Sequence, residues 1–127
     1  MIEKYALDGI KITSLESFYE QISSSLAFGE WGRNLDALDD VLGGGDYGVP
    51  EDGFTLTWVH SDVSRANLGY PETVRQLEKR LLLCHPSNRD MVQAKLNLAR
   101  EGKGHTVFDW LIDILRKHED NIRLVLA

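Results

Sequence analysis

The spacing of hydrophobic residues changes along the chain and predicts three strands separated by helices. Short apolar runs or alternating positions, typical of strands, occupy residues 2–7, 54–59 and 122–126. Between them hydrophobic residues recur every three to four positions, which predicts helices over residues 15–26, 35–42, 61–68, 71–84, 90–100 and 106–118. Because every connection between successive strands is helical, this order predicts an α/β fold with a small parallel sheet.

Local signals refine some of these elements. The near-continuous apolar run at 122–126 suits a strand that is buried on both faces. Thr13-x-x-Glu16 and Thr106-x-x-Asp109 have the spacing of a capping box, in which two side chains bind the free amides at a helix start. We therefore expect helices to begin just after each threonine.

The helix over residues 35–42 has the most distinctive pattern. Asn34 is a good N-cap, because its side-chain oxygen can accept from amides of the first turn. One face of the helix is apolar and carries Leu35, Leu38, Val41 and Leu42, and the opposite face carries Asp36, Asp39 and Asp40. Gly43-Gly44-Gly45 follows, and we expect these glycines to end the helix in the left-handed conformation.

The excess negative charge of the chain is concentrated in the same region. Residues 30–52 hold seven acidic residues and one basic residue, a net charge of −6, and the whole chain also carries −6. No basic residue nearby in the sequence neutralises the three aspartates of the helix. This face is either a solvated surface or a docking site for a basic partner.

Length and composition narrow the class of protein. A chain of 127 residues is expected to form one domain, over residues 1–127. Its pI near 5.1 argues against nucleic acid or an anionic membrane as the direct partner. No apolar run approaches the ~20 residues that span a bilayer. The first residues lack a signal pattern and Cys84 is the one cysteine, so we expect a cytoplasmic protein.

Two kinds of enzyme are weighed against a binding protein. Asp36, Asp39 and Asp40 could hold Mg²⁺ for hydrolysis, but all three lie on one convex helix face. His60-Ser61-Asp62 could be a hydrolytic trio, but neighbours in sequence rarely face one another as a nucleophile and its base must. We therefore expect no catalytic residue, no cofactor and no metal.

Several motifs together resemble the barstar family, small intracellular inhibitors of secreted bacterial ribonucleases. The most specific is the block from Trp31-Gly32-x-Asn34-Leu35-Asp36 to Asp40 and Leu42, and the others are Asp8-Gly9, Phe18-Tyr19, Trp58 and Ile122-x-Leu124-x-Leu126. The resemblance implies a three-stranded parallel sheet packed with helices in a three-layer architecture. It covers essentially the whole chain, although residues 84–105 make this sequence longer than the best-known member.

The resemblance also implies which residues bind the partner. In the family, the second helix and the loop before it block the nuclease active site, where helix carboxylates take the positions of RNA phosphates. Matched to this chain, the contact residues are Trp31, Gly32, Asn34, Leu35, Asp36, Asp39, Asp40 and Gly44, with Asp36 and Asp40 as the inhibitory carboxylates. Asp39 replaces a tryptophan and Glu30 replaces an interfacial tyrosine. No acidic contact residue is assigned on the last helix.

The sequence therefore predicts an inhibitor or immunity protein. Its expected partner is a basic, extracellular-type bacterial ribonuclease or toxin, bound through the acidic helix. Because two contact aromatics have become acids, a barstar-like scaffold that binds a different basic protein in a regulatory role remains open. Trp110 lies off the main apolar stripe of its helix, where it could cover the edge of a groove.

Overall fold

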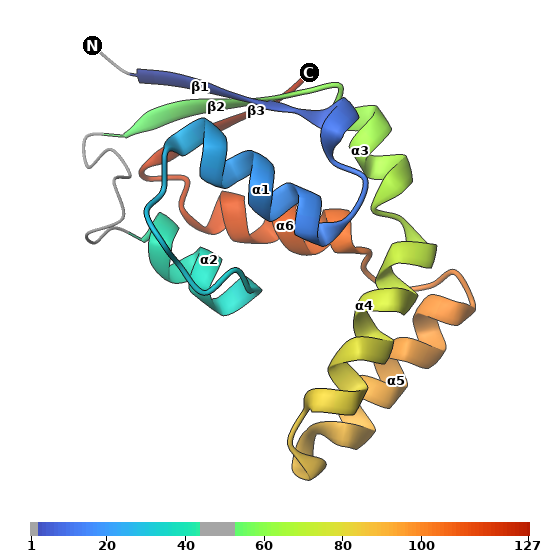
Figure 1. Cartoon of the computed structure of the whole chain (residues 1–127). Coiled ribbons are helices and arrows are strands. Elements are labelled where there is room, and N and C mark those ends of the chain that lie inside the picture. Colours follow the sequence, from blue (N-terminus) through green and yellow to red (C-terminus); the bar gives the residue numbers. More distant parts are fainter. Residues whose placement is uncertain (1–2, 44–52) are drawn as a thin grey trace.

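The computed structural model describes residues 3–43 and 53–127, and it has the predicted order of strands and helices (Figure 1). In chain order the elements are β1 (Glu3–Asp8), the 3-10 turn η1 (Gly9–Lys11), α1 (Leu15–Leu26), α2 (Leu35–Leu42), β2 (Phe54–Val59), α3 (Ser61–Asn67), α4 (Tyr70–Leu83), the 3-10 turn η2 (Pro86–Asn88), α5 (Arg89–Arg100), α6 (Val107–Lys117) and β3 (Ile122–Leu126). Within the described residues, no helix combines the length and the apolar character needed to cross a membrane.

The three strands form a parallel sheet in the order β1-β2-β3, so β2 is central. Tyr5 of β1 pairs with Leu56 of β2, which in turn pairs with Leu124 of β3. Both crossovers between parallel strands are helical, as such pairing requires. The predicted α/β fold class with a three-stranded parallel sheet is confirmed.

The helices are stacked on one face of this sheet. Figure 1 shows α1 and α6 directly against it and α2 beyond them, so the layers are the sheet, the pair α1 and α6, and α2. Trp58 of β2 is completely buried between Phe18 of α1 and Phe108 of α6, with ring centroids 5.3 and 5.1 Å away. Its indole Nε1 donates to Oγ of Ser64 at 2.9 Å, so the core also satisfies the polar atom of this side chain.

The prediction that β3 is buried on both faces is wrong. Ile122 is buried, but Arg123 is exposed and Val125 keeps 38% of its surface in contact with solvent. The reason is the one-sided stacking of the helices, which leaves alternate residues of β3 facing outward. The apolar run therefore reports strand propensity more than burial.

The capping boxes are confirmed for α6 and corrected for α1. Thr106 and Asp109 cap α6 reciprocally, as their spacing predicts. At α1 the box is formed by Ser14 and Ser17 instead of Thr13 and Glu16. A serine at the third helical position reaches the N-cap amide, which leaves Glu16 free to bind α4.

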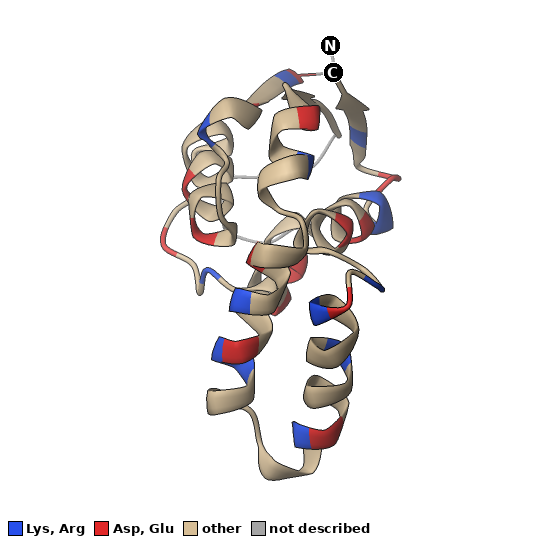
Figure 2. Cartoon of the chain, turned by 90° about the vertical axis from the view of Figure 1, so that its right-hand side faces the viewer, with Lys and Arg blue, Asp and Glu red and all other residues tan. Residues whose placement is uncertain are grey.

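Helices α4 and α5 form a hairpin that projects from the rest of the fold (Figures 1 and 2). Leu77 of α4 packs with Val92, Leu96 and Ala99 of α5 in a small core of their own. The extra length predicted at residues 84–105 therefore builds η2 and α5, which pair with α4. Cys84 is half-buried at the end of α4.

Glu72 fixes the base of this hairpin to α1. Its buried carboxylate accepts from the amide of Leu15 at 2.8 Å, one of the amides that a helix start leaves without a partner inside the helix. Arg75 donates to both Glu72 and Glu16, and Lys79 also donates to Glu16. Burial opposes ionisation of Glu72, but the hydrogen bonds from Arg75 and from the Leu15 amide outweigh it and lower its pKa.

Replacing Glu72 by alanine is expected to lower the free energy of unfolding by about 1–3 kcal/mol, because it leaves the buried amide of Leu15 without an acceptor. Urea unfolding followed by circular dichroism measures this. Glu72→Gln keeps an acceptor and should lose less, and the exposed Glu78→Ala on the same helix is the control. A loss for Glu72→Ala no larger than that of the control would contradict the role of this carboxylate.

Candidate functional site

Helix α2 presents an acidic face to solvent and an apolar face to the core. The Asn34 side chain accepts from the amide of Ala37 at 2.8 Å, so the predicted N-cap is confirmed. Leu38, Val41 and Leu42 are buried, and Leu35 is half-buried. Gly43 ends the helix with φ −74°, so the expected left-handed end does not occur at this glycine. Gly44 lies outside the described residues.

Asp36 and Asp40 lie one turn apart on the exposed face of α2. Neither carboxylate takes part in a hydrogen bond or ion pair with any side chain in the described part of the chain. Carboxylates at positions i and i+4 of a helix share one face about 6 Å apart along the axis. Two exposed acids are thus held at a fixed spacing and are available to a cationic partner.

Asp39 has a different environment, because two residues that are distant in the sequence neutralise it. Nζ of Lys117 and Nε2 of His118, at the end of α6, lie 2.6 Å from its two carboxylate oxygens. The hydrogen bonds from Lys117 and then His118 lower the pKa of Asp39, and the pKa of Lys117 is raised in turn. Asp39 therefore ties α2 to α6.

Replacing Asp39 by asparagine is expected to loosen α2 without unfolding the protein. The ion pairs to α6 are partly exposed, so their loss should speed amide hydrogen exchange in α2 by about fivefold or less. Exchange measured by NMR, with Asp62→Asn on α3 as the control, tests this. Unchanged protection of the α2 amides would exclude a clamping role for Asp39.

The loop before α2 is fixed by Trp31. Its indole Nε1 donates to Oγ of Ser23 at 2.7 Å, and its ring meets Tyr19 and Phe28 edge-on at 5.4 and 5.7 Å. The tryptophan is half-buried, and the following Gly32 is exposed. The predicted contact residues Trp31 and Gly32 therefore lie directly beside the start of the acidic helix.

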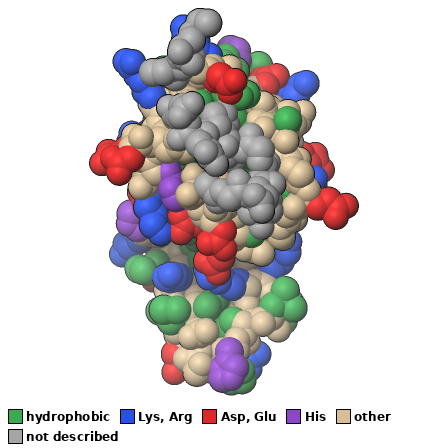
Figure 3. Space-filling model, turned by 90° about the vertical axis from the view of Figure 1, so that its left-hand side faces the viewer, with side chains coloured by type: hydrophobic (Ala, Val, Ile, Leu, Met, Phe, Trp, Pro, Cys, Tyr) green, Lys and Arg blue, Asp and Glu red, His purple; other side chains and the backbone are tan. Residues whose placement is uncertain are grey.

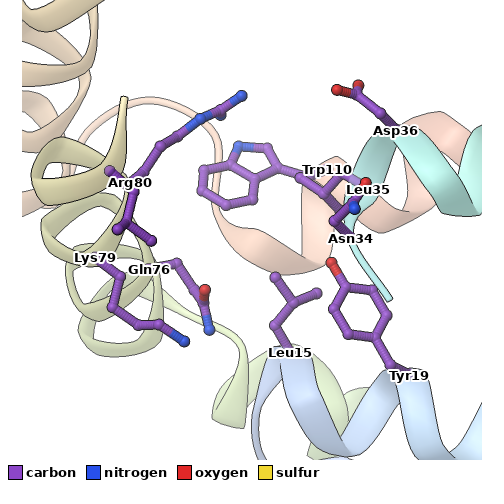
Figure 4. Close-up of a pocket in the computed structure, with 10 residues that line it drawn as sticks. Leu15, Tyr19, Asn34, Leu35, Asp36, Gln76, Lys79, Arg80 and Trp110 are labelled. Carbon is purple, nitrogen blue, oxygen red and sulfur yellow. The ribbon is translucent and has the colours of Figure 1, made fainter. Parts of the chain in front are cut away.

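A cleft of about 340 Å³ lies between α2 and the α4–α5 hairpin. Asn34, Leu35 and Asp36 line one side, and Lys79, Arg80 and Leu83 of α4 line the other. Figure 4 shows Trp110 of α6 between these two sides, with Leu15 and Tyr19 of α1 below. Trp110 lines this groove, as its position off the helix stripe suggested. The contribution of α4 was not predicted, because no local signal places one helix opposite another.

The enzyme alternatives gain no support from the described residues. No group of three His, Cys, Asp or Glu side chains there is arranged to hold a metal ion, and Asp39 faces α6 instead of Asp36 and Asp40. In the other candidate trio, the hydroxyl of Ser61 donates to the carbonyl of Ala127 at 3.0 Å. His60 is the residue before α3 and has a left-handed φ of 53°. Its side chain makes no capping hydrogen bond to this helix.

Together the fold and this surface define a small parallel α/β protein that presents an acidic helix beside a cleft. The family model described as Barstar (barnase inhibitor) matches residues 2–99, and the chain belongs to this family. The match extends from β1 almost to the end of α5 and leaves α6 and β3 outside it. No curated protein matches the chain. The family is one of inhibitors and not of enzymes, which makes the protein barnase-inhibitor-like.

Proposed function

We propose that this protein inhibits a bacterial ribonuclease by placing α2 over its cationic active site. The observation that carries the proposal is the pair of exposed carboxylates, Asp36 and Asp40, which lie one turn apart and make no hydrogen bond or ion pair within residues 3–43 and 53–127. A ribonuclease must hold phosphates with Arg and Lys side chains, and carboxylates can take those phosphate positions through charge-assisted hydrogen bonds. The concentration of negative charge in residues 30–52 would also steer a basic protein toward this surface.

The rigidity of the surface supports the same proposal. Leu38 and Leu42 hold α2 to the core, Asp39 holds it to α6, and Trp31 holds the preceding loop to α1. A binding surface that is already ordered loses less conformational entropy when the complex forms. This arrangement suits tight inhibition without a change of shape.

The proposed contact residues are those predicted from the sequence, with one change of role. Asp36 and Asp40 would bind the cationic groups, and Trp31, Gly32, Asn34 and Leu35 would surround them. We assign Asp39 chiefly a positioning role, because Lys117 and His118 already occupy its carboxylate. Gly44 is retained as a proposed contact from the sequence alone.

The domain organisation, the kind of partner and the location in the cell are part of the same proposal. We infer a single domain over residues 1–127, with Trp110 packing against both the main core and the hairpin core. The partner would be a basic, extracellular-type ribonuclease or toxin. A cytoplasmic location is consistent with a sequence that contains one cysteine.

Calorimetric titration against a panel of basic bacterial ribonucleases, barnase among them, tests the proposal. We expect one-to-one binding that inhibits the enzyme, weakens with salt and disappears in the Asp36→Ala/Asp40→Ala double variant. A matched double variant, Glu20→Ala/Asp62→Ala, removes two exposed acids from α1 and α3 and should bind normally. Inhibition that survives the loss of both α2 carboxylates would refute the mechanism.

A second candidate function is a regulatory contact with a different basic protein. The observation that favours it is the acidic residue at position 39, which is used inside the molecule where the family has a tryptophan. If no ribonuclease in the panel binds, while the acidic face still binds a basic protein through Asp36 and Asp40, this candidate replaces the first.

A further inference from the structure

The α4–α5 hairpin carries hydrophobic residues that stay exposed within the described part of the chain. Leu82 and Leu83, at the end of α4, keep 81% and 84% of their surfaces exposed, and Met91 of α5 keeps 55%. Two almost fully exposed leucines side by side at the end of a helix are typical of a surface that another protein covers. The hairpin core of Leu77, Val92 and Leu96 explains why α4 and α5 pair, but it does not explain these leucines.

The charge of the hairpin is opposite to that of α2. Residues 70–104 hold seven basic and four acidic residues, a net charge of +3. Figure 2 shows the basic residues distributed over both helices of the hairpin. A basic arm would repel the cationic active site of a ribonuclease, so it must face a different part of any such partner.

The cleft brings the two surfaces together. Asp36 of α2 lines one side, and Arg80 and Leu83 of α4 line the other. In the described part of the chain, the guanidinium of Arg80 makes no hydrogen bond or ion pair, whereas its neighbour Lys79 is paired with Glu16. In Figure 3 the acidic side chains at the centre of the face lie directly above hydrophobic and basic side chains of the lower part of the molecule.

A ribonuclease that covers Asp36 has to meet the hairpin. A stable protein interface covers about 800 Å² on each partner, so it extends well beyond the two carboxylates of α2. Asn34, Leu35 and Asp36 form one wall of the cleft, so a globular partner seated on them extends across it to α4.

We propose that the α4–α5 hairpin is a second arm of the inhibitor surface, which holds an acidic and apolar edge of the same ribonuclease beside its cationic active site. Arg80 pairs with a carboxylate of that edge, and Leu83 covers an apolar side chain. The arm selects among ribonucleases, because one with a basic edge at this place is repelled by Arg80. This inference rests on the proposed function.

Titration of hairpin variants with barnase and the other ribonucleases of the panel tests the inference. For the member that binds most tightly, Arg80→Glu should weaken binding about tenfold or more, and Leu83→Ser about tenfold. Matched controls are Arg89→Glu, at the start of α5, and Leu98→Ser, whose side chain is 45% exposed and lines a separate cleft. We expect the controls to change affinity less than about threefold. All four positions are exposed, so the variants should keep the circular dichroism of the parent.

The outcomes separate the inference from the function on which it rests. If the Asp36→Ala/Asp40→Ala variant loses binding but Arg80→Glu and Leu83→Ser keep it, the second arm is refuted and the inhibitor function stands. If no ribonuclease binds the parent chain, both fail. If Leu83→Ser keeps its affinity for the ribonuclease but abolishes a concentration-dependent dimer in sedimentation, the hairpin binds a second copy, and the inference is overturned.

Discussion

Asp40→Ala is expected to weaken ribonuclease binding by roughly 2–5 kcal/mol, because it strands cationic groups of the enzyme in a buried interface. That range is the general one for truncating one partner of a buried, hydrogen-bonded charge pair at a protein interface. The aspartate is exposed and makes no hydrogen bond or ion pair in the part of the chain that the structure describes, so its removal should cost the fold little. The loss should therefore appear in binding and not in stability.

Calorimetry measures the affinity, and stopped-flow kinetics show where the loss falls. We expect mainly faster dissociation, since most changes at an interface act on the dissociation rate. Asp62→Ala on α3 removes an equally exposed acid outside the proposed surface and serves as the control. If both variants lower the association rate equally and leave the dissociation rate unchanged, Asp40 contributes only to the long-range electrostatic attraction of the partner. It is then not a contact residue.

The acidic helix could be predicted from the sequence because its determinants are local. The Asn34 cap and the separation of Leu38 and Val41 from the aspartates follow from positions within three turns of helix. The partners of Asp39 could not be predicted in this way. Lys117 and His118 lie 78 and 79 residues further along the chain, and only the packing of α2 against α6 brings them to the aspartate.

The same distinction applies to the cleft. The hydrophobic spacing over residues 71–84 predicted a helix, but it could not indicate that α5 would cover this helix and project with it from the fold. The position of Arg80 opposite Asp36 depends on how the hairpin is anchored, and one anchor is the hydrogen bond from the amide of Leu15 to the carboxylate of Glu72. A side chain 57 residues away satisfies that amide, and the sequence gives no signal for the pairing.

Trp58→Ala is expected to have the largest effect on the fold, a loss of about 3–5 kcal/mol in the free energy of unfolding. The ring is completely buried and lies against both Phe18 and Phe108, so its removal leaves a cavity in the core. Its removal also takes the donor from Ser64, whose hydroxyl in turn binds the carbonyl of Gly9 where β1 ends. Such a loss is a large part of the 5–15 kcal/mol that stabilises a typical domain.

Urea unfolding followed by circular dichroism measures this loss, with Trp110→Ala as the comparison. Trp110 is only half-buried at the cleft, so its removal should cost clearly less. Trp58→Phe keeps most of the packing, so its loss in the free energy of unfolding should lie between those of Trp58→Ala and Trp110→Ala. Because α1 and α6 meet on this ring and α2 packs against α6, Trp58→Ala should also reduce inhibition when the measurement is made near its unfolding midpoint. Equal stability of the Trp58→Ala and Trp110→Ala variants would show that the sheet and its helices do not depend on this contact.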